Sequence, residues 1–521
     1  SRQDRRAPSS QFGVARALLR RARLAMATAA DAAREFATGP MALEAARLLL
    51  GHFPLPALCE ALANARPEDT VHLLTALERL AEFEEIRASF FSDSVAAFLR
   101  QGAESQDPRV RVVVAKLLSR LAKEGGEVGI GRLSEHGLLE ASEALLMDED
   151  TGIAEAAAGT FRAVMQYPAW REAALGAVDR LQNTLAGMPD VQRMRVLHLF
   201  IDIGRGSEDA FKALEGRGSY RHVLGAFITD DILLKMVSVE LMDSLGSFPA
   251  GQDFLSREGV PEQLALNLTD PMCDDSVRLC VVRLLSFIIR RNPTTMAKLL
   301  PGRESPLAQT IAGMLETSGS ESTERLTAMN AWANISLHAT GLAFFLQWEG
   351  RLNTILGHVS SMNNEVCKGA MAAWSLVLED RPPPSQIVEV GTEEAPAMML
   401  WEIAERRLLP AVVKNLQFKP FPDVRFHAWN LLALLVQSRA AAQIVVPSQE
   451  VRDLMLDFTS ELDSQARIAK HDFVKALLRH NDQWLAAFLD EKVMKVVEEY
   501  ARQSAHWVPR TAAVSVGQEA A

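Results

Sequence analysis

One sequence phrase returns along this chain and limits the folds that the chain can adopt. Each copy opens with polar or acidic residues, continues with an apolar marker residue and then places small or apolar side chains about one helical turn later. The marker residues are Val71, Val110, Ile153, Val191, Ile232, Val277, Leu326, Val366, Val424 and Ile468. Most intervals between them are about 38 to 49 residues, which is the period of armadillo and HEAT repeats. The pattern therefore predicts an array of α-helical repeats.

The composition agrees with such an array. A chain of 521 residues is too long for one ordinary hydrophobic core. Apolar residues make up 48% of it, mainly Leu and Ala, and Tyr occurs only 3 times, a balance that favours helices over strands. We therefore predict an all-α, armadillo/HEAT-like α-solenoid, a right-handed superhelix of stacked repeats in which each repeat buries its faces against its neighbours.

The predicted array covers residues 26–508. Three consecutive prolines, Pro382 to Pro384, cannot continue a helix and predict a surface loop near residues 380–397. Residues 1–25 are rich in arginine, and we expect a basic, disordered or non-native extension with Met26 as the biological start; an organellar transit peptide is the alternative. Residues 509–521 are small and polar, and are expected to form a flexible tail.

The copy "FPDVRFHAWNLLALL" places Asp423, Arg425 and His427 close together, as a catalytic cluster would. Asp423 follows a proline and is well placed to cap a helix N-terminus. A stripe of residues at helical spacing is expected to face the core: Val424, Ala428, Leu431 and Leu435. Because the spacing supplies neither an orienting third group nor a pocket, the cluster is interpreted as part of a repeat helix.

The sequence holds no motif of the common catalytic classes. Walker A, HExxH and GxSxG patterns are all missing, and glycine-rich stretches at 125–131, 204–207 and 216–219 are interpreted as turns between helices. The 4 cysteines lack CxxC spacing, and the histidines lack an i, i+4 pair. We therefore expect no enzyme activity, no metal, no cofactor and no small-molecule substrate.

The net charge and the hydropathy of the chain limit the classes of partner and the cellular compartments that we expect. The formal charge of −11 would repel phosphate backbones, so nucleic acid is not an expected partner. No apolar run approaches the ~18 residues needed to cross a bilayer, so no membrane is expected either. Scattered cysteines suit a reducing compartment, and we expect a cytoplasmic protein, with the nucleus as a further possible location.

Three tryptophans allow a comparison with one class of helical-repeat protein, the armadillo nuclear-import adaptors. Trp332, Trp374 and Trp429 each follow Ala and are interpreted as core residues. The import adaptors carry Asn one turn after such a Trp. Here the positions four residues later hold Ser336, Leu378 and Ala433, which argues against an import adaptor.

Several phrases resemble one family. "KPFPDVRFHAW", "SQARIAKHDFVKALLRHNDQW" and "HWVPRTAAVSVGQEAA" resemble, in the same order, the C-terminal part of the proteasome non-ATPase regulatory subunit 5 family, and "GQDFLSREGVPEQL" resembles its middle. The similarity runs from about Met26 to Ala521. It implies an assembly chaperone for the base of the proteasome regulatory particle that binds the C-terminal domain of an AAA ATPase subunit, contacts other base subunits in an assembly intermediate and hinders premature docking onto the core particle. The alternative is a generic armadillo-type adaptor or scaffold unrelated to the proteasome.

The resemblance carries no compact binding motif that could be transferred position by position. Candidate partner-binding residues are therefore polar and aromatic side chains of the C-terminal repeats that need not be buried: Arg425, His427, Lys470, His471, Lys475 and Trp507. Arg and Trp are enriched at interface hot spots. For each residue the alternative is a solvated or merely packed side chain.

Overall fold

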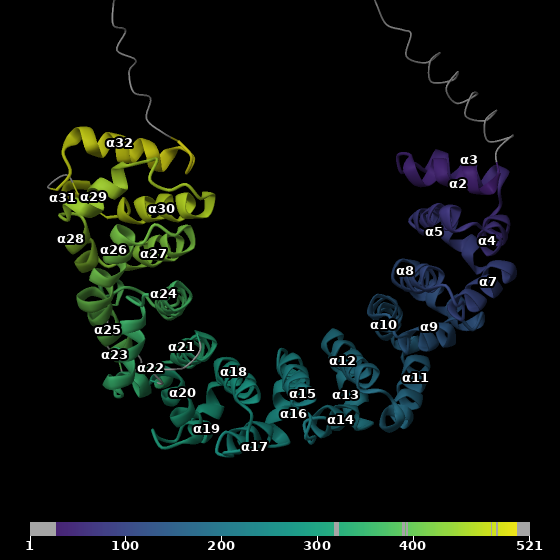
Figure 1. Cartoon of the computed structure of the whole chain (residues 1–521), viewed down its shortest axis with the longest axis horizontal. Coiled ribbons are helices and arrows are strands. Elements are labelled where there is room, and N and C mark those ends of the chain that lie inside the picture. Colours follow the sequence, from purple (N-terminus) through teal and green to yellow (C-terminus); the bar gives the residue numbers. More distant parts are fainter. Residues whose placement is uncertain are drawn as a thin grey trace, which may run out of the picture. The chain divides into compact units, whose positions relative to one another are not determined.

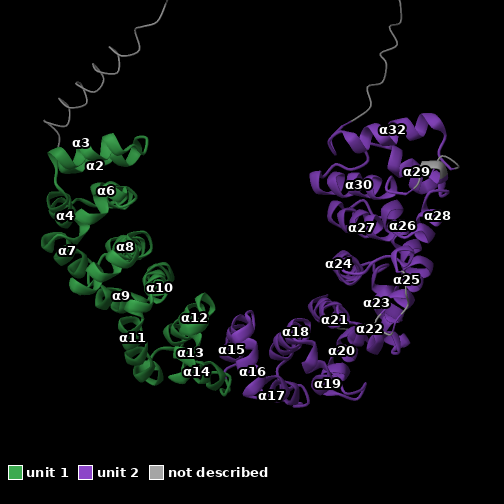
Figure 2. Ribbon diagram, turned by 180° about the vertical axis from the view of Figure 1, so that it is seen from behind, with its two compact units in different colours: residues 1–230 green, residues 231–521 purple. Residues whose placement is uncertain are grey.

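The computed structural model describes residues 28–316, 322–387, 391, 394–480, 482–485 and 488–507. Among these residues the regular structure is helical throughout and includes no strand, which confirms the predicted all-α repeat fold. The chain divides after Asp230 into two compact units, coloured separately in Figure 2. Each unit is a stack of helices with its own buried apolar side chains. The predicted extension and tail, residues 1–25 and 509–521, lie outside the described residues.

Unit 1 holds the helices up to residue 230 (Figure 1). Its longer helices α5, α8, α10 and α12 pack one against the next. The bounds in this unit are α2 (Ala29–Thr38), α3 (Leu43–His52), α4 (Leu55–Ala63), α5 (Pro67–Leu80), α6 (Glu84–Arg87), α7 (Asp93–Ala103), α8 (Pro108–Glu135), α9 (Leu138–Leu146), α10 (Thr151–Met165), α11 (Arg171–Thr184), α12 (Asp190–Gly206), α13 (Glu208–Gly216) and α14 (Ser219–Gly225).

Unit 2 repeats this arrangement, with α15, α18, α21, α24, α27 and α30 packed in sequence order on one side of the unit and shorter helices on the other (Figure 1). The exposed surface of α18, α21, α24, α27 and α30 is called the long-helix face below. The bounds are α15 (Ile232–Leu245), α16 (Pro249–Arg257), α17 (Val260–Asn267), α18 (Asp275–Arg291), α19 (Met296–Leu299), α20 (Pro306–Glu316), α21 (Ser322–Ser336), α22 (Ala339–Leu346), α23 (Glu349–His358), α24 (Asn364–Glu379), α25 (Glu394–Ile403), α26 (Leu409–Phe418), α27 (Pro422–Leu435), α28 (Arg439–Val445), α29 (Gln449–Leu456), α30 (Ser464–Leu477), α31 (Asp482–Leu485) and α32 (Glu491–Arg502).

The acidic residues that open the repeats act as helix caps. Their side chains accept backbone N–H bonds at the N-termini of α8, α10, α15, α18 and α30, and they are Asp107, Asp150, Asp231, Asp274 and Asp463. Such a cap satisfies a donor that the helix itself cannot pair and is worth about 1 kcal/mol relative to Ala. The polar opening of the sequence phrase therefore has a local physical cause.

Asp423 departs from this pattern, and the expectation that it caps its helix is wrong. Helix α27 begins one residue earlier, at Pro422, because the fixed φ of proline suits the first helical position. Asp423 consequently lies in the first turn, where its carboxylate accepts the Val424 N–H at 3.0 Å and pairs with Lys368 of α24 at 3.2 Å. The residue ties two neighbouring repeats together.

The sequence markers fall on successive long helices, one each from α5 to α30. They are not equivalent core positions, however, because Ile153 and Val277 are buried whereas Val71 and Ile468 are about half exposed. A shift of one residue rotates a side chain by about 100° around a helix, so an apolar residue in the first turn can miss the buried stripe. The stripe predicted for α27 is confirmed, with 0% exposure at Val424, Ala428, Leu431 and Leu435. Trp332, Trp374 and Trp429 are confirmed as core residues.

The structure contains both of the helix interruptions that Pro and Gly residues predict, one between two helices and one within a helix. Between the end of α24 and the start of α25, the described regular structure is a 3-10 turn at Pro384–Gln386. Helix α25 starts at Glu394, a few residues before the expected end of the loop. In unit 1, Gly126 adopts a positive φ of 59° and breaks α8 within the predicted glycine-rich turn. A left-handed φ of this kind is inexpensive only for glycine.

Cations bond the exposed carbonyl ends of the preceding repeat. In unit 1, Nη1 of Arg79, on α5, lies 2.6 Å from the carbonyl oxygens of both Phe36 and Ala37 at the end of α2. Arg120, on α8, donates in the same way to the Glu78 carbonyl near the end of α5, at 3.1 Å. The last carbonyls of a helix have no hydrogen-bond partner within the helix, and they form the negative end of its dipole. A cationic side chain placed there donates hydrogen bonds to these carbonyls and also interacts favourably with the dipole.

The same contact recurs in unit 2 with different donors. Arg291 donates to the Gly246 carbonyl after α15 at 2.9 Å, and the His338 ring donates to the Arg290 carbonyl of α18 at 2.9 Å. Arg381 donates to the Ser336 carbonyl at the end of α21, and burial lowers the pKa of Arg381 to about 10. The guanidinium therefore stays charged near neutral pH. We call these bonds the carbonyl contacts.

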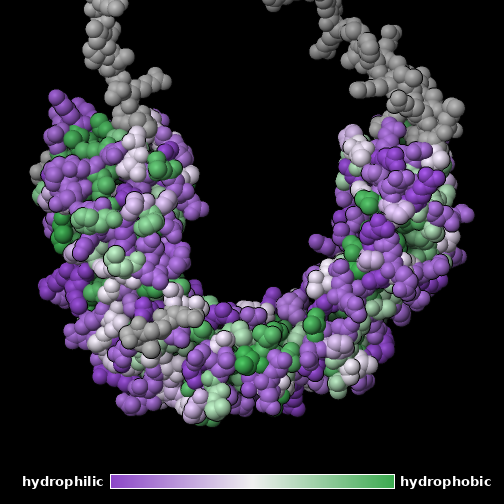
Figure 3. Space-filling view, viewed as in Figure 1, coloured by the Kyte–Doolittle hydropathy of each residue, from purple (hydrophilic) through white to green (hydrophobic). Residues whose placement is uncertain are grey.

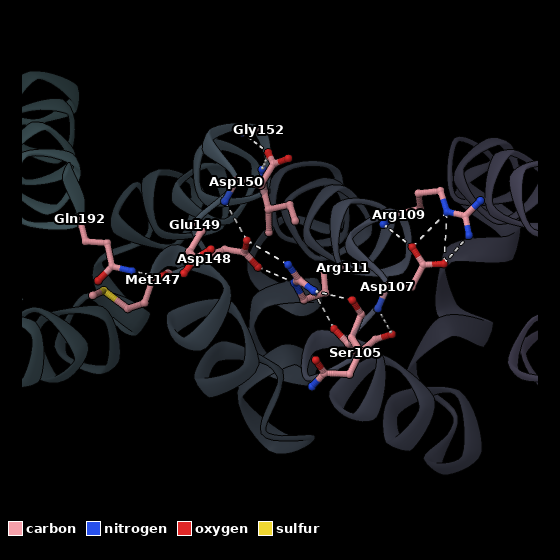
Figure 4. Close-up of polar contacts among 12 residues, drawn as sticks. Ser105, Asp107, Arg109, Arg111, Met147, Asp148, Glu149, Asp150, Gly152 and Gln192 are labelled. Carbon is pink, nitrogen blue, oxygen red and sulfur yellow. Dashed lines mark hydrogen bonds and ion pairs between the residues drawn. The ribbon is translucent and has the colours of Figure 1, made fainter. Parts of the chain in front are cut away.

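The opposite ends of the helices in unit 1 are also linked across repeats (Figure 4). Arg111 of α8 donates to the Asp148 carboxylate before α10 at 2.5 Å and to the Ser105 carbonyl at 2.8 Å. Gln192 of α12 donates to the Met147 carbonyl at 2.7 Å. Both ends of neighbouring repeats are thus joined by side-chain bonds to the backbone or to a capping loop.

Replacing Arg79 with Met should show what a carbonyl contact contributes. The variant leaves carbonyls at the end of α2 without their charged donor, and we expect a loss of about 1–3 kcal/mol of stability, measured by urea denaturation. Hydrogen exchange should accelerate first in α2. The matched variant Arg66→Met removes an exposed arginine and should change neither measurement, whereas unchanged exchange of α2 in Arg79→Met would contradict the assignment.

Candidate partner-binding surfaces

Arg425 belongs to a buried ion pair that joins α27 to the segment before α30. Its Nε donates to the Glu461 carboxylate at 2.8 Å, and the two side chains are only 11% and 2% exposed. The Trp429 indole N–H donates to the same carboxylate at 2.8 Å. Burial opposes ionisation of Glu461, but the bonds from Arg425 and Trp429 hold the pKa of that carboxyl below its usual value. This geometry gives Arg425 a structural role.

Lys470 lies beside this ion pair and is 2% exposed. Its Nζ donates to the Asp457 carbonyl at 2.6 Å and to the Ser460 hydroxyl at 3.0 Å. The ammonium also lies 5.7 Å from the centroid of the Trp429 ring, within cation–π range. Burial lowers the pKa of Lys470 to about 8. The side chain fastens the connection between α29 and α30 to the core.

His471 faces the other side of α30. It is 6% exposed, and its Nε2 bonds to the Tyr500 carbonyl of α32 at 3.1 Å. The expectation that Lys470 and His471 are accessible is therefore wrong. Helix α30 contacts both α27 and α32. Asp457 and Ser460, in the segment before α30, supply the polar partners of Lys470, and Tyr500 of α32 supplies that of His471, so both side chains can be buried.

The three remaining candidates are more accessible. His427 is half-buried, and burial together with nearby Lys368 lowers its pKa. Trp507 is half-buried, with its ring centroid 5.9 Å from that of Phe458. Lys475 is exposed on α30. A role in partner binding stays a prediction for these side chains.

Lys475 lines a hollow of about 400 Å³ on the long-helix face, formed by α24, α27 and α30. Side chains of both charges and two amides reach it, namely Glu379, Asn430, Gln437, Asp472, Lys475 and Arg479. Such a lining can pair with charges of either sign and can hydrogen-bond a backbone. Of this set, only Lys475 is a candidate that the sequence predicts. The i, i+4 spacing of Lys475 and Arg479 in the sequence could have identified the second cation, although α30 ends at Leu477 and Arg479 lies just after it.

Exposed apolar side chains interrupt a mostly hydrophilic surface (Figure 3). In unit 2 several of them lie in or next to the short segments before α24, α27 and α30: Met362, Phe418 at the end of α26, Phe421 and Leu462, with 93%, 72%, 48% and 88% exposure. We call these residues the apolar loop edge. Lys419 donates to the Ser361 carbonyl, which joins the first two segments. Large apolar side chains exposed in this way are candidates for contact with a partner. From sequence alone, these residues cannot be distinguished from core residues.

The described residues bring together no group of His, Cys, Asp and Glu suited to holding a metal ion. Within the same residues, no helix is both long and apolar enough to cross a membrane.

Glu461 provides a test of the buried ion pair. Replacing it with Ala leaves the Arg425 guanidinium buried without its carboxylate, and we expect unit 2 to lose about 3–5 kcal/mol, measured by urea denaturation. Glu491 forms an exposed i, i+4 pair with Lys495, so Glu491→Ala is the matched control and should leave the denaturation midpoint unchanged. Equal effects of the two substitutions would refute the structural role of the buried pair.

Lys470 should make stability depend on pH in the alkaline range. Burial disfavours the charged amine, so the folded protein releases this proton near pH 8 and the unfolded chain only near 10.5. The stability of the wild type relative to Lys470→Met should therefore rise by about 3 kcal/mol as the pH increases from 8 to 10.5, and fall again when the pH is lowered. Denaturation of both proteins across this range tests the prediction, which a pH-independent difference would overturn.

Comparison with known proteins supplies the family. A family model described as "Proteasome non-ATPase 26S subunit" matches residues 59–521. The 26S proteasome non-ATPase regulatory subunit 5 of Mus musculus is 21% identical over 463 residues, covering 86% of this chain and 88% of the mouse protein. The Homo sapiens protein of that name is 23% identical over 455 residues, covering 83% and 84%. An engineered protein of solved structure is 18% identical, covering 81% of this chain and 98% of its own, with a TM-score of 0.40. The resemblance found in the sequence is confirmed, and the chain belongs to the proteasome non-ATPase 26S subunit family.

Proposed function

We propose that this chain is a cytoplasmic assembly chaperone for the base of the proteasome regulatory particle. It binds the C-terminal domain of an AAA ATPase subunit, together with other base subunits in an assembly intermediate, and hinders premature docking onto the core particle. The observation that carries the proposal is the family match, which extends over residues 59–521. The function requires binding and release and no catalysis.

The surfaces of unit 2 suit such a function. A standard protein interface buries roughly 800 Å² on each partner, and a helical-repeat stack offers an extended face for one. The hollow of α24, α27 and α30 supplies charges and amides, and the apolar loop edge supplies hydrophobic contacts. Interfaces commonly combine these two kinds of surface.

A chaperone also has to be displaced when the correct neighbours arrive. Obligate interfaces are large and hydrophobic, whereas transient ones are more polar. The hollow presents Glu379 and Asp472 alongside Lys475 and Arg479, so its contacts are charged and lie in water before binding. Charged contacts of this kind speed association and impose specificity more than they increase affinity, which is compatible with timely release.

Binding of the purified chain to the separate C-terminal domains of the ATPase subunits of the base tests the proposal. We expect selective binding of one domain, and Lys475→Glu together with Arg479→Glu should weaken it about tenfold, measured by calorimetry. Arg425 is unsuitable for this test because it stabilises the fold.

The matched control reverses two exposed lysines of α32, Lys492→Glu with Lys495→Glu, and should bind like the wild type. If none of the domains binds, although each is shown to be folded, the proposal fails and the generic adaptor takes its place.

A further inference from the structure

A second hollow on the long-helix face differs in charge from the one described above. It has a volume of about 290 Å³ and lies between α18, α21 and α24. Its polar lining consists of Arg283, Ser286, Arg290, Thr327, Asn330 and Asn334. Among these described lining residues two are cations and none is a carboxylate. This is unexpected in a chain of formal charge −11.

Other hollows carry carboxylates among the residues that line them. Between α10 and α12 in unit 1, a hollow of about 480 Å³ contains Arg162 and Arg205, which share the Asp202 carboxylate of the lining at 2.6 and 3.6 Å, and Arg162 also pairs with Glu155. The hollow of α24, α27 and α30 balances its two cations with two carboxylates. The hollow between α18, α21 and α24 therefore offers positive charge that no carboxylate of its own described lining neutralises. It is called the hollow between α18 and α21 below.

Arg290 is held in place by a buried amide. Its Nη1 donates to the Asn334 Oδ1 at 3.2 Å, and the Asn334 Nδ2 donates to the Ser286 hydroxyl at 3.2 Å. Asn334 is 4% exposed, so this chain of bonds is fixed in the core while Arg290 itself is exposed. In the part of the chain that the structure describes, Arg290 has no ion pair. A guanidinium fixed by one nitrogen keeps further donors for a ligand.

The other groups around Arg290 extend the site along the face. Arg283 lies two helical turns earlier, roughly 10 Å away along the axis of α18. Arg283 also forms an exposed ion pair with Glu240 of α15, at 3.6 Å, and Glu240 is not among the residues that line the hollow. Asn330 is exposed one turn before Asn334, and Leu376 adds an apolar contact from α24.

We infer that the hollow between α18 and α21 binds carboxylate side chains of an acidic, extended segment of a protein partner. Arginine forks bind carboxylates with two parallel N–H bonds, and two of them two turns apart can hold two acidic side chains of one segment. The Asn330 amide can donate to and accept from the backbone between them. The identification of the partner as an ATPase subunit rests on the proposed function, but the preference for carboxylates does not.

A pair of peptides tests the carboxylate preference directly. The probes are a short fluorescein-labelled peptide of alternating Glu and Ser and its counterpart with Gln at every Glu, measured by fluorescence anisotropy with the full chain. We expect the wild type to bind the Glu peptide at least tenfold more tightly than the Gln peptide, and Arg283→Gln with Arg290→Gln to abolish the difference. Equal binding of the two peptides to the wild type overturns the inference.

Two further variants separate the site from folding and from net charge. Arg283→Gln with Asn330→Ala leaves the buried Asn334 bonds intact and should still reduce the preference several-fold. Lys298→Gln with Lys414→Gln removes the same charge from α19 and α26, outside the long-helix face, and should retain the preference in full. Loss of the preference in the lysine control would assign it to net charge and overturn the site.

The affinity for the C-terminal domain of the ATPase subunit provides a second measurement. Its Kd should rise at least tenfold for Arg283→Gln with Arg290→Gln and stay within twofold for the lysine control. Binding of a domain to the wild type that the arginine variant does not weaken would reject the hollow as the partner site while the proposed function stands. Absence of any domain binding would reject the proposed function, and the peptide pair would still decide the carboxylate site.

Discussion

The carbonyl contacts are the interaction on which the repeat stack depends. Helices end in carbonyl groups that have no partner within the helix, and at the ends of α2, α5, α15, α18 and α21 the next repeat brings a side-chain donor to them. Arg79 performs this function in unit 1, and Arg291 and Arg381 perform it in unit 2. Because the donor and the acceptor come from different repeats, the bond forms only when the repeats are stacked in register. Apolar burial supplies most of the driving force for packing, but it is not directional. The carbonyl contacts add the orientation that apolar contact lacks.

Much of this architecture could be predicted from the sequence, because it arises from local rules. Acidic caps, apolar stripes and breaks at Pro or Gly each act within a few residues, and the recurrence of the phrase reveals the number of residues per repeat. Trp429 and the α27 stripe were placed in the core for this reason. The same rules do not predict which side of its helix each marker residue faces. Val71, for example, lies one position away from the buried stripe of its helix and is exposed.

The candidate site could be predicted only in part, because burial of a polar residue is decided by distant neighbours. Lys470 and His471 look like surface residues in the sequence, yet Asp457 and Tyr500 supply acceptors that permit their burial. Arg425 is paired with Glu461, which is 36 residues away and 2% exposed. The spacing of these residues in the sequence does not indicate that their side chains form one cluster. Lys475, by contrast, lies exposed on the surface, as its charge suggests.

Stability and recognition are consequently assigned to different side chains of the same helices. On α18, Arg291 bonds the carbonyl end of the preceding repeat, whereas its sequence neighbour Arg290 lines the hollow on the long-helix face. The structural positions accept several solutions, as the use of His338 in place of an arginine shows. A stack built this way requires a cap, an apolar stripe and a donor rather than particular residues. Identities of only 21% to 23% can therefore span more than four fifths of each chain. The exposed positions of the long helices are not bound by these requirements, so a repeat protein can change its partner specificity there without redesigning its core.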